Sequence, residues 1–223
     1  MNLSLNQKLA HIGLRLSLRT EAKARSKTSA FNADIEDTLL EAAAEIPKQS
    51  KLFSLLLSWI EVHAGYVIVE KLMKKVQKLD SNDPARVWIN GLAIYATHRG
   101  FHKWKRWVEK SESPVYLYTE KTSQSALQLK GAVPYFEEKG YLIPEGSIRV
   151  RTADALTPSE LSRQNKQFQN RLLYGPSWRA DIITAIEEGI ETPYAVAKLV
   201  GCSYEPAHRV FNEYNIAKGR VIA

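Results

Sequence analysis

The stretch from Thr192 to Phe211, near the C-terminus, constrains the fold of this chain more than any other. It predicts two short helices that cross at a fixed angle, because small or apolar residues recur where two such helices must touch. The residues expected on the buried faces are Val196, Ala197, Val200, Ala207 and Val210. Gly201 stands where the turn needs a positive φ, and Cys202 follows it as a small, half-buried hydrophobe.

The ends of these helices are also marked. Thr192 and Pro193 provide an N-cap and a proline at the first helical position, and Ser203 is expected to cap the second helix. An amphipathic helix is predicted just before them, from Trp178 to Glu188, with Gly189 ending it. Three consecutive helices are therefore expected in residues 176–217.

With these features, residues 176–217 resemble the helix-turn-helix superfamily of DNA-binding domains, in particular its winged members. One wing strand is expected at 220–222, and its partner strand would have to come from elsewhere in the fold. A weaker similarity of organisation is to transcriptional regulators of the AbiEi antitoxin kind, which pair such a domain with a mostly helical one. The DNA-binding module of those regulators is typically N-terminal, whereas here it is C-terminal. The resemblance implies binding to double-stranded DNA.

The outer face of the second motif helix carries donors, acceptors and planar groups that suit contact with base edges. The expected base-contacting residues are Ser203, Tyr204, Glu205, His208, Arg209 and Asn212. The expected phosphate contacts are Lys198, Lys218, Arg220 and, as a weaker candidate, Arg179. Two amphipathic helices joined by a glycine turn also occur in enzymes and in protein-docking modules, so the pattern leaves these alternatives open.

Composition agrees with a partner that is a polyanion. The 223 residues include 31 Lys and Arg against 24 Asp and Glu, a formal net charge of +7. A single cysteine excludes an intramolecular disulfide. The longest apolar run, 52–60, is too short to cross a bilayer, so a cytoplasmic protein without a membrane partner is expected.

The expected fold is mainly α with a small β element. Residues 1–111 are predicted to form a helical domain, whose helices are expected within 3–18, at 33–46 after an N-cap at Asn32, at 50–62, at 72–79 and at 85–98 after Asp83 and Pro84. Near the start of the helix at 33–46, Asp34, Glu36 and Asp37 are interpreted as acids that interact favourably with the positive end of the helix dipole. In the helix at 72–79, the solvent-facing side is expected to carry Lys71, Lys74, Lys75 and Lys78. The basic segment 19–29 is a solvated helix or a flexible arm.

Cations and aromatic residues alternate in 101–108. This pattern suits single-stranded nucleic acid, but Phe101, Trp104 and Trp107 also have the spacing of a core stripe, which is the favoured interpretation. His98 and His102 are four residues apart without a third ligand, so no metal site is predicted.

The composition changes after residue 111. Short β-prone runs at 115–119, 141–143 and 147–151 predict a small antiparallel sheet within 112–157. Thr157 is expected to cap a helix that fills 158–175 and links the body to the DNA-binding domain at 176–223.

Catalysis needs a constellation of residues, and none is recognisable: there is no glycine-rich phosphate loop, nucleophile elbow or metal-ligand spacing. We therefore predict no catalytic residue and no cofactor. The predicted function is sequence-specific binding of double-stranded DNA in transcription regulation. The alternative is a non-enzymatic docking or structural module of a larger system, such as a mobile element or a toxin–antitoxin pair. The apolar stretch 52–79 would form a homodimer interface, a site for a partner protein, or the core of the single chain.

Overall fold

The computed structural model describes residues 3–16 and 30–219, and the fold is mainly helical, as predicted. The basic segment 19–29 and the wing strand at 220–222 lie outside the described residues. The α-helices are α1 (Leu5–His11), α3 (Ile35–Glu45), α4 (Lys51–His63), α5 (Val69–Val76), α6 (Pro84–His98), α7 (Glu120–Lys130), α8 (Pro134–Glu137), α9 (Pro158–Gln164), α10 (Lys166–Tyr174), α11 (Trp178–Glu187), α12 (Pro193–Val200) and α13 (Tyr204–Ala217). The 3-10 helices are η1 (Ala30–Ala33), η2 (Ala64–Tyr66), η3 (His102–Trp107) and η4 (Thr152–Asp154), and the strands are β1 (Val115–Tyr116) and β2 (Tyr141–Leu142).

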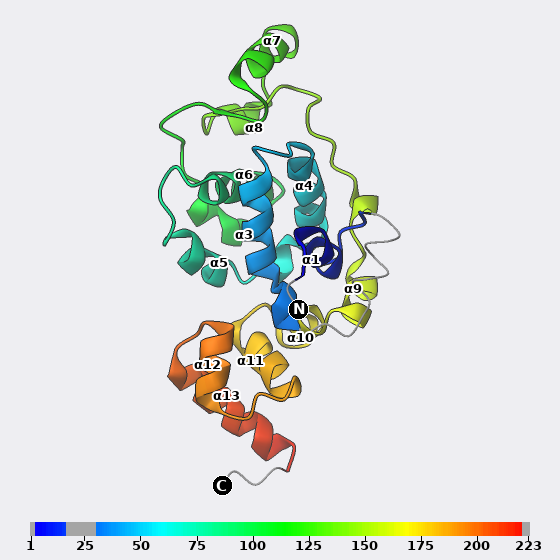
Figure 1. The fold of residues 1–223 in the computed structure, drawn as a ribbon, viewed down its shortest axis with the longest axis vertical. Coiled ribbons are helices and arrows are strands. Elements are labelled where there is room, and N and C mark those ends of the chain that lie inside the picture. Colours follow the sequence, from blue (N-terminus) through cyan, green and yellow to red (C-terminus); the bar gives the residue numbers. More distant parts are fainter. Residues whose placement is uncertain (1–2, 17–29, 220–223) are drawn as a thin grey trace.

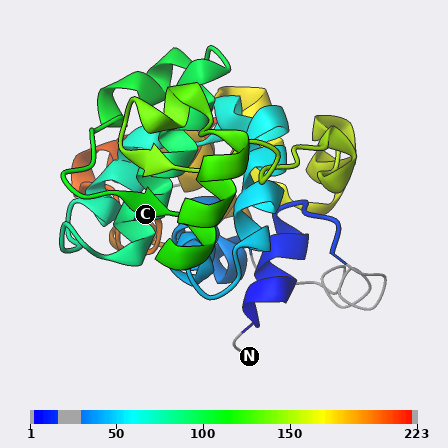
Figure 2. The ribbon, with the colours of Figure 1, turned by 90° about the horizontal axis from the view of Figure 1, so that it is seen from above.

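Two hydrophobic cores divide the molecule along its long axis (Figure 1). The larger core belongs to the body, where α3, α4 and α6 pack against one another and α1 packs against α3. It includes Phe136 and Tyr141, so residues 112–157 pack into the same core as residues 1–111. The smaller core lies between α11, α12 and α13, which we call the C-terminal unit. Figure 1 shows α7 and α8 at the end of the body farthest from that unit, which is the end that faces the viewer in Figure 2.

The sheet differs from the prediction, because β1 and β2 run parallel, with Val115 opposite Tyr141 and Tyr116 opposite Leu142. Parallel neighbours require a crossover connection, and α7 and α8 supply it. The helix α7 is missing from the sequence prediction since almost every side chain on it is at least partly exposed, which removes the apolar stripe that marks an amphipathic helix.

The β-prone run 147–151 is not a strand. It lies along α4, where the backbone N–H groups of Arg149 and Arg151 donate to the hydroxyls of Ser54 and Ser58 at 3.2 and 3.0 Å. These hydrogen bonds replace those of a sheet. They also explain why two serines interrupt the apolar run of α4.

Several helix ends differ from the prediction. The N-terminal helix α1 stops at His11, because Gly13 has a φ of 100° and Leu14 pairs with Ala155. Asn32 lies in η1, and the N-cap of α3 is Asp34, whose side chain accepts a hydrogen bond from the backbone N–H of Asp37.

The linking segment 158–175 is two helices, not one. The break is at Asn165, whose side chain accepts from the backbone N–H of Phe168 at 2.8 Å and donates to the backbone oxygen of His11 at 3.1 Å. A buried asparagine thus ends α9, caps α10 and fastens both to α1. The predicted cap at Thr157 is confirmed, since Thr157 and Glu160 form a reciprocal capping box.

The apolar stretch 52–79 is core of the single chain. Its buried hydrophobic residues are Leu52, Phe53, Leu56, Leu57, Trp59, Ile60, Ala64, Val67, Ile68, Val69, Leu72 and Val76. This stretch therefore offers no broad face for the homodimer or partner protein considered above. The core interpretation of 101–108 is confirmed as well: Trp104 is buried with its Nε1 donating to the backbone oxygen of Ala64, while Lys103 and Lys105 are exposed. Within the described residues, no helix has both the length and the apolar character needed to cross a bilayer.

Candidate nucleic-acid interface

The C-terminal unit has the local structure that its sequence predicts. Thr192 caps α12 by accepting from the backbone N–H of Ala195 at 3.2 Å, and α12 ends at Gly201, which is left-handed with a φ of 81°. The five residues expected on the buried faces of the two helices are all buried. Cys202 is half-buried, and burial raises the pKa of its thiol, as expected of a small hydrophobe in this position.

The cap of α13 is a partial exception. Ser203 has the extended backbone of an N-cap residue, but its hydroxyl accepts no hydrogen bond from the first turn of the helix. Pro206 lies in that first turn, where a backbone N–H has no partner within the helix, so it does not disturb α13. The start of α13 is therefore set by the extended backbone before it and by burial of Ala207.

The outer face of α13 brings the six expected base-contacting residues together. Tyr204 and His208 lie one turn apart with ring centroids 5.5 Å from each other, and Asn212 Nδ2 is 3.2 Å from His208 Nε2. These three side chains form a continuous row along the helix. All six are exposed except Asn212, which is partly buried: Ser203, Tyr204, Glu205, His208, Arg209 and Asn212.

Glu205 and Arg209 form a second row on the same face. Both are exposed, and no hydrogen bond or ion pair joins either of them to another described side chain. Their charged groups are therefore available to an external partner. Charged groups without partners are common at a protein surface, so the significance of these two lies in their place directly after Tyr204 and His208 in the first turns of α13.

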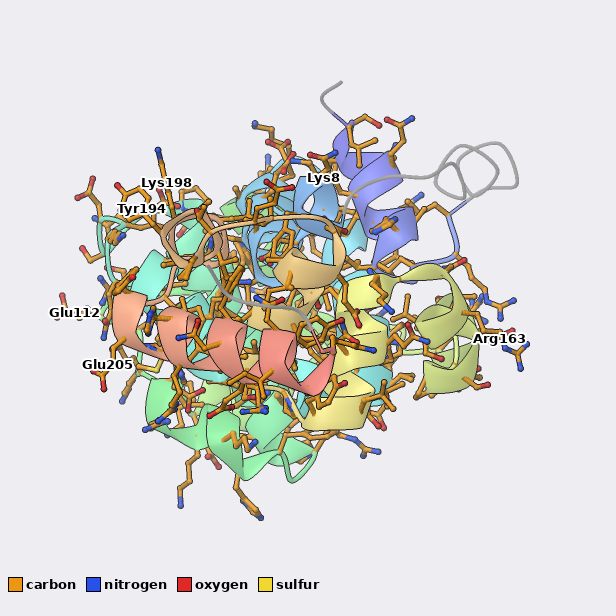
Figure 3. All side chains as sticks on the ribbon, turned by 90° about the horizontal axis from the view of Figure 1, so that it is seen from below. Lys8, Glu112, Arg163, Tyr194, Lys198 and Glu205 are labelled. Atoms are coloured by element: carbon orange, nitrogen blue, oxygen red, sulfur yellow. The ribbon has the colours of Figure 1, made fainter. Side chains whose placement is uncertain are left out.

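The expected phosphate contacts are in three different situations. Lys198 is exposed on α12, and Lys218 is exposed with its Nζ 5.7 Å from the centre of the Tyr214 ring. Arg179 is engaged in an ion pair, since its Nη1 is 2.6 Å from Glu213 Oε2. Arg220 lies outside the described residues. In Figure 3, α13 crosses the near side of the molecule, and Tyr194, Lys198 and Glu205 point outward along one edge.

Comparison of the chain with protein-family models, curated proteins and solved structures finds no match. The resemblance of residues 176–217 to helix-turn-helix domains therefore depends on the residues and the geometry of this chain alone.

The positive charge of the protein is not on the C-terminal unit. Residues 176–223 hold five cations, Arg179, Lys198, Arg209, Lys218 and Arg220, against six acids, Asp181, Glu187, Glu188, Glu191, Glu205 and Glu213, a net charge of −1. Because the whole chain carries +7, the body, residues 1–175, carries a net charge of +8. Attraction of a polyanion thus depends on the body as well as on the three helices.

A buried cluster of charges joins the body to the C-terminal unit, and the sequence analysis did not predict it. Arg171 on α10 donates to both carboxylate oxygens of Glu36, at 2.7 Å each, and to both oxygens of Asp181 on α11, at 2.9 Å each. Lys71 on α5 contacts Asp34, Asp181 at 2.7 Å and Glu36 at 3.3 Å. All five side chains are almost fully buried.

We call these five residues, Asp34, Glu36, Lys71, Arg171 and Asp181, the joint cluster, and their mutual attraction explains why charged groups are stable inside the protein. Burial alone would raise the pKa of Asp34, but the nearby cations Lys71 and Arg171 hold it at about 2. Burial acts against the charged forms of Arg171 and Lys71 too, yet the surrounding carboxylates raise both pKa values. Gln167 completes the network by donating to Asp34 at 2.7 Å and accepting from the backbone N–H of Ile35. The two cations and the carboxylates of Asp34 and Asp181 thus stabilise one another in their charged forms.

Three carboxylates this close could in principle bind a cation, and Asp34, Glu36 and Asp181 are the one such group in the described part of the chain. Lys71 Nζ lies among their oxygens, and Arg171 occupies the remaining oxygens of Glu36 and Asp181. The carboxylate oxygens are therefore already engaged by two cations of the protein itself. His98, the other metal candidate, stacks on Tyr135 with ring centroids 3.9 Å apart.

The interpretation of Asp34 and Glu36 as acids at a helix start was incomplete. Asp34 does cap α3, but Glu36 is fully buried and pairs with Arg171, and Lys71 is buried although it was expected to face solvent. One signal was present in the sequence. Asp181 lies among Ala180, Ile182 and Ile183 on the predicted leading helix, and an acid among apolar residues requires a buried cation as its partner.

Proposed function

We propose that this protein binds double-stranded DNA sequence-specifically through the helix-turn-helix of α12 and α13, as a regulator of transcription and not as an enzyme. The observation that supports this most is the outer face of α13. It is exposed, it carries six polar or aromatic side chains, and it leaves Glu205 and Arg209 without partners among the described residues. The inner face of the same helix is committed to the small core through Ala207, Val210 and Phe211.

In this proposal each group of residues has a role of its own. The major groove, about 12 Å wide, admits one α-helix, and α13 would enter it with its N-terminal half. Arg209 then faces guanine, whose O6 and N7 accept two parallel hydrogen bonds from a guanidinium, and Glu205 faces the amino group of a cytosine. Lys198 on α12 and Lys218 just after α13 are exposed and would contact phosphates.

The first prediction separates base contact from phosphate contact. Arg209→Ala should lose about 1–3 kcal/mol of binding free energy and lose the preference at one base pair, because the bidentate contact is specific to guanine. Lys218→Ala should weaken binding to every sequence alike, because a phosphate carries no sequence information. The target is first selected from a random duplex library with the wild-type protein, and affinities are then measured by fluorescence anisotropy on that target and on its single-base variants.

Lys218→Ala is the matched control for Arg209→Ala, since both remove one exposed cation from the same helix or its end. An Arg209→Ala protein that keeps the full wild-type preference at every base pair would remove α13 from base contact. A wild-type protein that selects no sequence and binds no duplex at low salt would contradict the proposed function itself.

Exposed apolar surface near the same face favours docking to a protein as the second candidate function. Tyr194, Leu199 and Tyr204 are 69, 42 and 54% exposed. Aromatic side chains in such positions serve both protein interfaces and nucleic-acid contacts. The two functions differ in their response to salt, since DNA binding releases counterions and weakens steeply as salt rises, whereas docking through these residues would change little.

A further inference from the structure

We infer that a basic groove between the body and the C-terminal unit is a second DNA contact, in which Lys74 and Lys78 bind phosphates of the duplex beside the site of α13. This inference rests on the proposed function and extends the binding surface from the C-terminal unit onto α5. It is carried by the distribution of charge, the shape of the groove, the state of its lysines and the rigidity of its walls.

The charge distribution requires such a contact. Residues 176–223 carry a net charge of −1, so the three helices by themselves would not attract a polyanion. Most of the affinity for duplex DNA comes from neutralised phosphates, and each neutralised phosphate requires a cation. Beyond Lys198, Arg209, Lys218 and Arg220, and with Arg179 paired to Glu213, further cations must come from the body, and those nearest to α13 are the best placed.

The groove lies where the body meets the turn before α13. It has a volume of about 410 Å³, and its walls come from α5 and the residues after it on one side and from the C-terminal unit on the other. The body contributes lysines and Gln77, and the C-terminal unit contributes Trp178, Val200 and Gly201. Because Gly201 is three residues from the first residue of α13, the groove adjoins the end of α13 that would enter the major groove. No carboxylate lines it among the described residues.

The lysines of the groove are not equivalent. Lys71 is buried in the joint cluster, and Lys75 pairs with Asp37 at 2.5 Å. Lys74 and Lys78 are exposed, and no carboxylate within the described residues pairs with either. Lys74 reaches across to the C-terminal unit, where its Nζ lies 5.1 Å from the centre of the Trp178 ring. Two ammonium groups are therefore left for phosphates.

The joint cluster holds the two walls of the groove in place. Lys71, one turn before Lys74 on α5, bonds directly to Asp181 on α11 at 2.7 Å, and Trp178 is one turn before Asp181. A buried network of this kind has one arrangement in which every group is satisfied. The groove is therefore preformed, and DNA would meet Lys74 and Lys78 at a fixed distance from α13 without the cost of ordering two domains.

The test compares two double variants of the full chain that remove the same charge. The groove variant, Lys74→Ala with Lys78→Ala, removes the two exposed lysines of the groove. The α7 variant, Lys121→Ala with Lys130→Ala, removes two exposed lysines of α7 at the opposite end of the molecule (Figure 1). Binding of a labelled random-sequence duplex of about 30 base pairs, roughly three helical turns, is measured by anisotropy over a range of salt concentrations. Circular dichroism melts check that both variants fold.

The groove variant should bind more weakly at low salt, and the slope of log K against log salt should shrink by up to about 1.8, since each phosphate contact contributes about 0.9. The α7 variant should match the wild type in both respects. All three proteins retain Arg209, so their preference for the selected target over its single-base variants should be the same.

The two proposals fail in different ways. If the wild type binds the duplex with a steep salt dependence but the groove variant behaves as the α7 variant does, the groove contact is wrong and the proposed function stands. An equal loss in both variants would also overturn the groove contact, since it would show a response to total charge alone. If the wild type binds no duplex, the proposed function fails, and the groove contact fails with it.

Discussion

Replacing Arg171 by methionine would test how the C-terminal unit is attached to the body. Arg171 makes five hydrogen bonds from a fully buried position: two to Glu36, two to Asp181 and one to the backbone oxygen of Tyr66. Methionine is uncharged and unbranched, so the change removes the cation while it fills the volume of the aliphatic part of the arginine side chain. Asp34, Glu36 and Asp181 would then share the single positive charge of Lys71.

The expected cost is about 3–5 kcal/mol of unfolding free energy, the range found when one partner of a buried ion pair is removed. With a urea slope of about 2–3 kcal/mol per molar, the midpoint of unfolding should fall by about 1–2.5 M. The matched control is Arg179→Met, which breaks the exposed ion pair with Glu213 at 2.6 Å. That change should cost less than about 1 kcal/mol, because the pair is exposed and Glu213 stays hydrated after Arg179 is removed.

A pH series separates an electrostatic loss from a loss of packing. In the wild type the cations hold the pKa of Asp34 and of Asp181 below the ordinary range. In Arg171→Met, Lys71 is the one cation left beside the buried carboxylates, so desolvation should raise the pKa values of Asp34 and Asp181, and protonation then lowers the cost of their burial. The difference in stability between the two proteins should shrink as the pH falls from about 7 towards 4. A cost near that of Arg179→Met, or a difference that is independent of pH, would refute the electrostatic account of the joint.

Two further predictions concern stability. His63 is buried with its Nε2 2.9 Å from the backbone oxygen of Leu156, and burial lowers its pKa to about 4 from 6.5. Below pH 6.5 the unfolded chain takes up a proton at His63 that the folded protein does not, so the free energy of unfolding is highest above pH 6.5 and falls as the pH drops towards 4. The loss of unfolding free energy should amount to about 3 kcal/mol, at about 1.36 kcal/mol per unit of pKa. The variant His63→Gln should lack this part of the pH dependence. Urea titrations at several pH values measure it, and the same pH dependence in the variant as in the wild type would contradict the prediction. Gly201 has a φ of 81° with nothing near an added Cβ, so Gly201→Ala should cost about 1 kcal/mol from backbone strain alone, and a variant as stable as the wild type in thermal melts would show that the turn can relax.

Prediction from the sequence succeeded best where a structure depends on neighbours along the chain. The cap at Thr192, the turn at Gly201 and the cap at Thr157 involve groups at most a few residues apart, and the structure has all three. The apolar faces of α12 and α13 likewise follow from helical spacing alone. The candidate base contacts were found in the same way, since they are the residues left on the outer face when the buried positions are removed.

The parts that could not be predicted depend on which elements meet. The parallel pairing of β1 with β2 follows from the unexpected helix α7 between them, and the break at Asn165 depends on the backbone oxygen of His11. Ser54 and Ser58 look like interruptions of an apolar helix until the backbone of 147–151 is placed beside them. In each case the deciding hydrogen bond joins residues far apart in the chain.

Local sequence accounts for the helical character of the chain and for the three-helix form of its C-terminal unit, because caps, glycine turns and apolar spacing act over one or two helical turns. Which charges are buried depends instead on how distant segments pack together. Lys71 and Lys74 are three residues apart on one helix, yet Lys71 is buried against Asp181 while Lys74 faces a groove. That difference arises from the packing of α11 against the body, since a charged side chain is buried only where a distant segment supplies its counterion.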